Sequence, residues 1–257
     1  MPSTASYVYA VIHGTKAPAL KGVPPGLAGA AQPLVVSAGK ALWVALAAVP
    51  LAVYGSDALE NALRDMNWVA DVAVAHEAVV EFLARQPAAT VIPMKLFTMF
   101  STVDRAVAET RSRRKDIDAV VKRIAGCEEW GVRIVRTPGG PELADRRRPM
   151  SGAAFLAAKR RTRDEAREAA RVAAEMAQGV FEALSAIARE ARRREGAPAG
   201  ATALPLLDAA FLVPGARRAR FKAAARRLSS RSAAVKGEMT LTGPWPAYNF
   251  VEAGERA

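Results

Sequence analysis

Strand-like and helix-like apolar patterns follow one another along this chain of 257 residues. Over residues 239–242 every second residue is apolar, which is typical of a half-buried strand. Residues 90–99 are almost continuously apolar and rich in Val, Ile and Phe, as in a fully buried strand. The predicted strands are residues 7–12, 34–36, 42–46, 90–99, 132–136, 209–212 and 239–241.

Apolar spacings of three and four residues predict helices between these strands. Asp57, with Glu60 three residues later, forms a candidate capping box for a short helix. A second helix is predicted over residues 67–85, where Val72, His76, Val79 and Leu83 share one face. Two more are predicted over residues 104–124, behind an Asp104 N-cap, and over residues 215–228.

The longest predicted helix runs from Gly152 to about Arg194. At about 1.5 Å per residue it would extend about 60 Å. The helix over residues 104–124 is its expected partner, as in a helical hairpin or a short coiled coil. The Gly196–Gly200 segment is the break that follows it. Its predicted buried face consists of Ala166, Ala169, Ala173, Met176, Val180, Leu184, Ile187 and Ala191.

The order of these elements predicts an α+β protein of two domains. Each half contains the elements of a ferredoxin-like α/β sandwich, and the long helix or helical hairpin, coiled-coil-like, packs alongside. The N-terminal domain is predicted over residues 1–126 and has an extra strand. The C-terminal domain is predicted over residues 127–257 and includes the long helix at 152–195.

Residues suited to catalysis or metal binding are scarce. His13 and His76 are the only histidines, and the single Cys127 excludes an internal disulfide and a thiolate metal site. Glu128 and Glu129 are adjacent on a predicted strand, so their side chains point to opposite faces. No phosphate-binding glycine motif or nucleophile elbow occurs. We therefore predict no catalytic, cofactor-binding or metal-binding residues, and a protein that is not an enzyme.

The apolar segments are too short to cross a membrane. The longest, Ala41 to Tyr54, has 14 residues and contains Pro50, whereas a spanning helix needs about 20. It fits a buried strand and its exit. The first 15 residues lack the basic and apolar regions of a secretory signal. A cytoplasmic location is expected.

The net charge of +12 is concentrated in the C-terminal half. Residues 1–145 carry +1, residues 146–236 carry +13, and the last 21 residues carry −2. Three interpretations are open: a solvated helix face with ion pairs, a surface that docks an acidic protein, and a site for nucleic acid. Aromatic residues, which stack on single-stranded bases, are few here. The clusters are Arg146–Arg148, Lys159–Arg161, Arg192–Arg194, Arg217–Arg218 and Arg226–Arg227.

Several short motifs recur in an order that resembles a known family. The most unusual is Met239 to Val251, which contains Thr-Gly-Pro-Trp-Pro and then Tyr248. The others are Tyr7–Val11, Asp65–Val69 with Ala75–Val79, Val91–Phe100, Cys127–Val132, Ser151–Arg160 and Asp208–Val213. Together they resemble the gas vesicle protein family GvpF/GvpL over nearly the whole chain. Phe155 stands where Tyr is common in that family, and residues 96–98 lack its usual glycine.

The resemblance implies a non-enzymatic role in building gas vesicles. A member of this family is expected to contact the small hydrophobic shell protein and other gas vesicle proteins, at the gas vesicle or in the cytoplasm. A basic nucleic-acid-binding module is the alternative. Trp245 and Tyr248 are predicted to be structural anchors that pin the C-terminus to the second domain.

Overall fold

The chain forms two compact units. The computed structural model describes residues 3–87, 89–136, 152–194, 205–233 and 235–251. Unit 1 comprises Met1–Glu128 with Trp245–Ala257, and unit 2 comprises Glu129–Pro244. Both mix helices with an antiparallel sheet, so the predicted mixed fold is confirmed at that level. The arginine cluster at 146–148 and the break at 196–200 lie outside the described residues.

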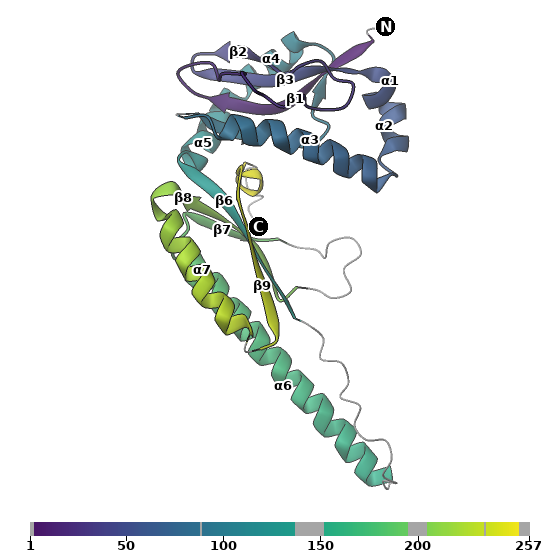
Figure 1. Ribbon diagram of the computed structural model, residues 1–257, viewed down its shortest axis with the longest axis vertical. Coiled ribbons are helices and arrows are strands. Elements are labelled where there is room, and N and C mark those ends of the chain that lie inside the picture. Colours follow the sequence, from purple (N-terminus) through teal and green to yellow (C-terminus); the bar gives the residue numbers. More distant parts are fainter. Residues whose placement is uncertain (1–2, 88, 137–151, 195–204, 234, 252–257) are drawn as a thin grey trace. The chain divides into compact units, whose positions relative to one another are not determined.

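Unit 1 is built on a sheet with the strand order β2-β3-β1-β4, in which β5 also pairs with β1 (Figure 1). The longest pairing is between β1 and β3, from Thr4 opposite Pro50 to His13 opposite Leu42. The strands are β1 (Thr4–His13), β2 (Leu34–Gly39), β3 (Leu42–Pro50), β4 (Thr90–Pro93) and β5 (Met99–Phe100). The helices are α1 (Leu51–Tyr54), α2 (Ser56–Ala62), α3 (Met66–Ala84), α4 (Val103–Ser112), α5 (Arg114–Ile124) and the short 3-10 turn η2 (Tyr248–Phe250).

Helix α3 covers the sheet of unit 1 with the face that its spacing predicts. Val72, His76, Val79 and Leu83 are all buried, and they belong to α3's inner face. The helix begins at Asp65, whose carboxylate accepts hydrogen bonds from the backbone N–H of Asn67 (2.9 Å) and Trp68 (3.4 Å). This N-cap satisfies donors that have no partner within the helix.

A long connection, residues 14–33, joins β1 to β2 and is held by two tyrosine hydroxyls. The Tyr9 hydroxyl accepts from the backbone N–H of Leu27 at 3.2 Å, and the Tyr54 hydroxyl donates to the carbonyl of Ala28 at 3.0 Å. Gly26 lies in the left-handed region (φ 79°), and a Cβ there would overlap the Tyr9 hydroxyl. Only glycine fits that position without displacing the tyrosine.

Unit 2 is built on a sheet with the strand order β7-β8-β6-β9 (Figure 1). Its buried aromatic residues lie together: the ring centroid of Phe221 is 6.2 Å from that of Trp130 and 5.5 Å from that of Phe211. Helix α7 and the C-terminal half of α6 pack on the side of the sheet that carries these rings. The elements are β6 (Cys127–Arg136), α6 (Gly152–Ser185), β7 (Glu190–Arg193), β8 (Leu207–Pro214), η1 (Gly215–Arg217), α7 (Arg218–Ala233) and β9 (Gly237–Trp245).

The long helix is shorter than predicted and has a different partner. It ends at Ser185, and Glu190–Arg193 forms strand β7, which pairs with β8. Residues that suit a helix are thus extended here, because strand pairing overrides a weak helical preference. Within its own unit, α6 packs against α7 and β8.

Three local predictions in unit 1 also need correction. The strand predicted over 90–99 is interrupted between β4 and β5, where Phe97 adopts a left-handed conformation (φ 63°). The helix predicted over 104–124 is two helices that meet at Arg113. The side chain of Thr102, rather than that of Asp104, caps the N-terminus of α4. Helix α2 begins at Ser56 without a side-chain cap, and Asp57 lies within its first turn instead of preceding the helix.

The last strand is longer than the predicted segment 239–241. Strand β9 continues through Gly243 and Pro244 to Trp245, which an edge strand permits because a proline there leaves no ladder bond unmade. Gly243 has φ 115°, and a Cβ would lie 2.8 Å from the carbonyl oxygen of Glu129.

The residues after β9 belong to unit 1 rather than to the second domain. The Trp245 ring is not a buried anchor, because Trp245 is 40% exposed. Phe250 is fully buried, and Tyr248 packs against the core of unit 1. These two residues, and not Trp245, hold the C-terminal segment.

Candidate protein-binding site

The N-terminal half of α6 is the most exposed regular structure among the described residues. Every residue from Gly152 to Val172 is exposed, and the first buried one is Ala173. A helix of about 20 residues without tertiary packing is marginally stable in water. We therefore treat this half, residues 152–172, as a candidate surface for a partner and call it the free half of α6.

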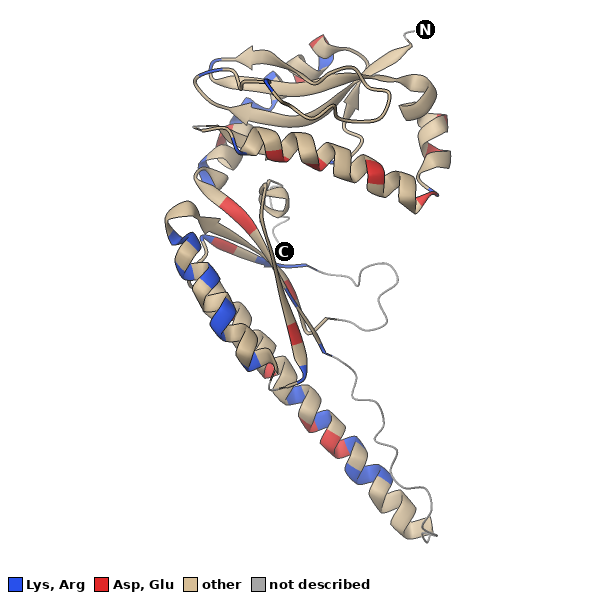
Figure 2. Cartoon of the chain, viewed as in Figure 1, with Lys and Arg blue, Asp and Glu red and all other residues tan. Residues whose placement is uncertain are grey.

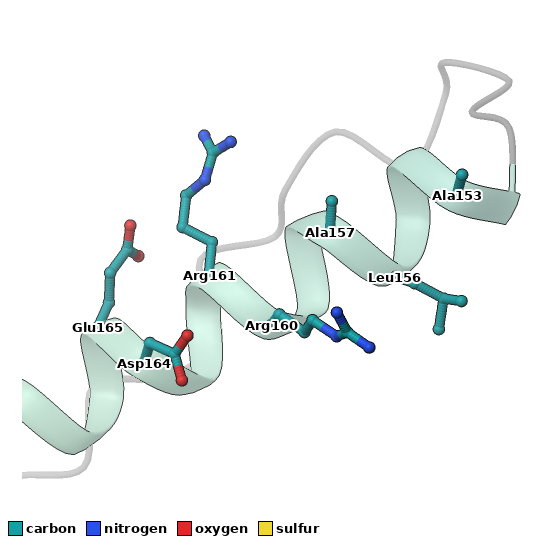
Figure 3. Close-up of a pocket in the computed structure, with 7 residues that line it drawn as sticks. All are labelled: Ala153, Leu156, Ala157, Arg160, Arg161, Asp164 and Glu165. Atoms are coloured by element: carbon teal, nitrogen blue, oxygen red, sulfur yellow. The ribbon is translucent and has the colours of Figure 1, made fainter.

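The free half combines apolar residues at its beginning with charged residues further along. Phe155 and Leu156 are 59% and 58% exposed. A shallow groove runs between two rows of side chains spaced four apart (Figure 3). One row is Ala153, Ala157, Arg161 and Glu165, and the other is Leu156, Arg160 and Asp164.

The shape of this groove favours a protein over a small molecule. All seven residues that line it come from one helix, so it is an open surface rather than an enclosed cavity. Rows spaced four residues apart are the ridges that interdigitate when two helices pack. The arrangement can accept an amphipathic helix, with an apolar contact at Leu156 and ionic contacts further along.

The charges of α6 are largely compensated within the helix. Arg171 donates to Glu168 at 2.6 Å and also binds Glu175. The hydrogen bond from Arg171 lowers the pKa of the Glu168 carboxyl, and Glu168 in turn raises the pKa of Arg171. Arg163 lies 3.9 Å from Asp164, whereas no ion pair joins Arg160 to that carboxylate. The predicted solvated face with ion pairs describes this helix.

The cluster at 192–194 is engaged inside unit 2. Arg192 pairs with Glu190 at 2.8 Å, and Arg194 pairs with Asp208 at 2.6 Å. The guanidinium of Arg193 lies 4.5 Å from the centre of the Phe181 ring. These three arginines stabilise β7 and its neighbours, so their substitution would disturb the fold as well as the surface.

The two histidines do not form a site. His13 is the last residue of β1 and is half-buried. His76 is buried in unit 1, where its Nδ1 lies 2.8 Å from the Tyr7 hydroxyl. Within the part of the chain that the structure describes, no three His, Cys, Asp or Glu residues come together as metal ligands. Cys127 is half-buried at the start of β6.

Burial, rather than a catalytic arrangement, controls the titration of the residues around His76. It lowers the pKa of His76 to about 4, while the backbone of Met94 acts more weakly in the opposite direction. It also raises the pKa of Tyr7, Tyr9 and Tyr54. The cluster is therefore uncharged at neutral pH and acts as a hydrogen-bonded core.

Tyr248 is also uncharged at neutral pH. Burial is the main cause that raises its pKa, and the Glu77 carboxylate is the second.

The acidic pair lies on β6, where Glu129 is buried and Glu128 is half-buried. Adjacent strand residues face opposite sides, so the expectation that Glu128 and Glu129 do not form an acid–base pair fits the strand geometry. None of the described helices is long and apolar enough to span a membrane.

The exposed nature of the free half was missed at the level of sequence. Ala166 and Ala169 were expected to be buried but are exposed, whereas Ala173, Val180 and Leu184 are buried as expected. The segment between Leu156 and Val172 contains no large apolar residue, and that gap was the available indication. Alanine suits a helix whether it is buried or exposed, so its spacing alone does not identify a core face.

Comparison with known proteins places this fold in a family. The family model described as gas vesicle synthesis protein GvpL/GvpF matches residues 5–252. The chain therefore belongs to the GvpL/GvpF family, which confirms the resemblance drawn from the motifs. Among characterised sequences, gas vesicle protein L of Streptomyces sp. (strain CB03234) is 28% identical over 219 residues, covering 81% of this chain and 79% of that protein.

Two solved structures share the fold along nearly the whole chain. The crystal structure of the gas vesicle protein GvpF from Anabaena sp. PCC7120 superposes with a TM-score of 0.68 at 12% identity, covering 99% of each chain. The crystal structure of GvpF from Microcystis aeruginosa superposes with a TM-score of 0.67 at 12% identity, covering 96% of this chain and 99% of the other. At this level of identity both similarities concern the fold.

Proposed function

We propose that this protein is a non-enzymatic assembly factor for gas vesicles. The observation that carries the proposal is the match to the GvpL/GvpF family from residue 5 to residue 252, because it covers both units. Membership implies a role in gas vesicle formation. The protein would act at the gas vesicle, by binding the small hydrophobic shell protein and other gas vesicle proteins.

The free half of α6 is the surface we assign to the shell protein. A subunit that places an apolar face against gas is prone to aggregate before it is incorporated. Phe155 and Leu156 offer exposed apolar contacts beside a groove that fits a helix. Packing of a partner helix would also supply the tertiary contacts that residues 152–172 lack within the described structure.

The strand orders support the finer fold assignment. Counted along its own sequence, the sheet of unit 1 has its strands in the order second, third, first, fourth, and so does the sheet of unit 2. In unit 2 the elements follow one another as β-α-β-β-α-β, which is the ferredoxin-like sequence of elements. We infer that both units are variants of that plan, unit 1 having a loop in place of its first helix.

Co-purification with the shell protein tests the function and the surface together. We expect the wild-type chain to retain the tagged shell protein, and the variant Phe155→Ser/Leu156→Ser to lose most of that binding. Leu34→Ser/Val53→Ser is the matched control, because these residues of unit 1 are also exposed, at 41% and 40%. Failure of the wild-type chain to bind would refute the shell-protein role; equal loss in both variants would refute the surface.

Nucleic-acid binding is the alternative, and α7 is the element on which it would depend. The cations of α6 and β7 are mostly compensated by carboxylates, whereas α7 has six Lys or Arg and no Asp or Glu. A gel-shift assay at physiological salt distinguishes the two functions. Submicromolar binding that falls steeply with salt would favour nucleic acid.

A further inference from the structure

Helix α7 presents a cationic face at Arg220, Arg226, Arg227 and Arg231, for which the described residues provide no ion-pair partner. Its 16 residues include six Lys or Arg and no acid, in contrast to α6, where both signs alternate (Figure 2). Unit 2 as a whole holds 23 Lys or Arg against 12 Asp or Glu, a net +11, while unit 1 holds 14 against 13, a net +1. The charge excess of the chain is therefore a property of unit 2.

The buried side of α7 fixes which residues face outward. Phe221, Ala225, Leu228 and Ser232 are buried and lie on one side of the helix. The outward positions are small, namely Ala219, Ala223 and Ser230. Arginines flank this row of small residues on both sides: Arg220, Arg227 and Arg231 on one flank and Arg226 on the other.

These four arginines are exposed and carry an electrostatic cost. No ion pair involves any of them among the residues that the structure describes. Arg227 and Arg231 are four residues apart, a spacing at which like charges destabilise a helix. The core contacts of α7 come from its opposite side, so packing within the described part of unit 2 does not require these arginines.

A face with the opposite properties exists on unit 1 of the same chain. Helix α3 contains Asp71, Glu77 and Glu81 and no Lys or Arg. Asp71 is exposed, Glu77 is half-buried beside Tyr248, and Glu81 pairs with Arg85 at 2.7 Å directly after the helix. At the outer surface Val74 is 70% exposed and Met66 is 67% exposed. The surrounding region is also acidic, with six Asp or Glu against two Arg over residues 51–85. The face thus combines negative charge with protruding apolar side chains.

We propose that the outer face of α7 in one copy of this chain docks on the outer face of α3 in a second copy. Val74 would pack against the row of small residues on α7, where Ala and Ser permit close approach of two helices. Asp71 and Glu81 would lie beside the flanking arginines. The two helices are matched in length, since 16 and 19 residues correspond to about 24 and about 28 Å. A second copy is the one partner whose complementary surface is present on this chain.

The geometry of this contact has a consequence for assembly size. The two faces differ, so the contact is heterologous, and each copy that uses its α7 still has a free α3 face. Association therefore either closes, as a reciprocal pair with two such contacts or as a larger ring, or continues as an open chain. A contact of one helix on one helix is small, so it is weak and strongly dependent on salt.

Mass measurement on the nuclease-treated full chain tests the proposal. The wild-type protein should form species larger than a monomer at low salt and revert to a monomer near 1 M, where the screening length falls to about 3 Å. The variant Arg220→Glu/Arg227→Glu should weaken the association about ten-fold or more. Lys16→Glu/Lys21→Glu is the matched control, since both lysines are exposed in unit 1 and the change in net charge is the same.

Mixing two variants distinguishes contacts between copies from contacts within one copy. In the chain with Arg220→Glu/Arg227→Glu the outer face of α7 has lost its cationic excess and α3 stays acidic, whereas in the chain with Asp71→Lys/Glu81→Lys α3 is basic and α7 stays cationic. Each alone should remain monomeric, whereas an equimolar mixture should associate, because the α7 of the second variant and the α3 of the first are both unchanged. Circular dichroism confirms that both variants are folded.

Several outcomes would overturn the inference. A wild-type chain that stays monomeric at low salt does so directly. Association that survives the α7 reversal, or that the lysine control abolishes equally, also contradicts the proposal. Association that disappears on nuclease treatment contradicts it too, because it indicates bridging by nucleic acid. A mixture that fails to associate shows that α7 does not dock on α3. None of these results depends on whether the protein binds the shell subunit.

Discussion

Units 1 and 2 have the same strand order but stabilise their cores in different ways. The core of unit 1 contains the hydroxyls of Tyr7, Tyr9 and Tyr54 and the imidazole of His76, with hydrogen bonds among them or to the backbone. The core of unit 2 is made of aromatic rings and aliphatic side chains. The stability of unit 1 therefore depends on the protonation and pairing of polar groups, whereas that of unit 2 depends on close packing.

The largest expected effect concerns packing in unit 2. Phe211 is fully buried between Phe181 and Phe221, with centroids 5.7 and 5.5 Å away. Phe211→Ala should reduce the free energy of unfolding of unit 2 by about 3–5 kcal/mol, through lost burial and the cavity left behind. Because the two units need not unfold together, amide hydrogen exchange should be followed separately in β8 and β1.

A matched control is Phe155→Ala, which removes the same ring from the exposed part of α6. It should leave the exchange rates of both units unchanged. If Phe211→Ala accelerated exchange in unit 1 as much as in unit 2, the units would not be energetically separate and the comparison would fail.

The second effect is pH-dependent and is confined to unit 1. Burial lowers the pKa of His76 to about 4, against 6.5 for an exposed histidine. The unfolded chain therefore binds a proton in the range between these values while the folded chain does not, so stability falls as the pH drops from 6.5 to 4. The loss is about 3 kcal/mol. Chemical denaturation followed by exchange in β1 measures it.

The variant His76→Gln shows whether this histidine is responsible. Glutamine keeps a hydrogen-bond acceptor near Tyr7 but does not titrate, so the pH dependence of unit 1 between 6.5 and 4 should become shallower. Unit 2 contains no histidine and serves as the internal reference. An unchanged slope in unit 1 would rule out His76 as its cause.

A smaller effect comes from pairing in the same cluster. Tyr7→Phe removes the hydroxyl that lies 2.8 Å from Nδ1 of His76 and leaves a buried nitrogen without its partner. We expect a loss of about 1–3 kcal/mol from unit 1, detected by thermal or chemical unfolding. Phe211→Tyr is the reciprocal experiment, since it adds a hydroxyl to the apolar core of unit 2; neutral outcomes for both would remove the distinction between the cores.

The smallest effect concerns the helix that covers the polar core. Asp65→Ala removes the side-chain cap of α3 and should cost about 1 kcal/mol. Asp65→Asn is the control, because its amide oxygen can accept the same hydrogen bonds from Asn67 and Trp68. Faster exchange in the first turn of α3 for the alanine variant alone would verify the cap.

Much of the fold could be predicted because local patterns and burial agree. The apolar run of β1 is buried along nearly its whole length, and the inner face of α3 buries the positions that a helical period implies, so both elements are predictable from the sequence. Strand β7 was missed because Glu190, Arg192 and Arg193 carry no apolar alternation, and its extended form arises from pairing with β8. The grouping of Phe250 with unit 1 rests on contacts distant in sequence, which local patterns do not contain.

The candidate surfaces were less predictable for a related reason. The arginines of α6, β7 and α7 look alike in sequence, yet Arg171 and Arg194 have carboxylate partners and Arg227 has none in the described structure. Only the folded arrangement separates them. Exposure of Phe155 and Val74 likewise depends on what lies beside each helix.

The path of the chain makes unit 2 a module inserted within unit 1. The chain leaves unit 1 after Glu128 and returns at Trp245, and the strands that carry these two crossings, β6 and β9, are neighbours in one sheet. The two ends of the insertion therefore lie close together. Residues 129–244 could be excised and replaced by a short Gly/Ser linker, leaving unit 1 with its C-terminal segment intact. Such a separation would let the two halves of the molecule be exchanged or redesigned independently, as cassettes.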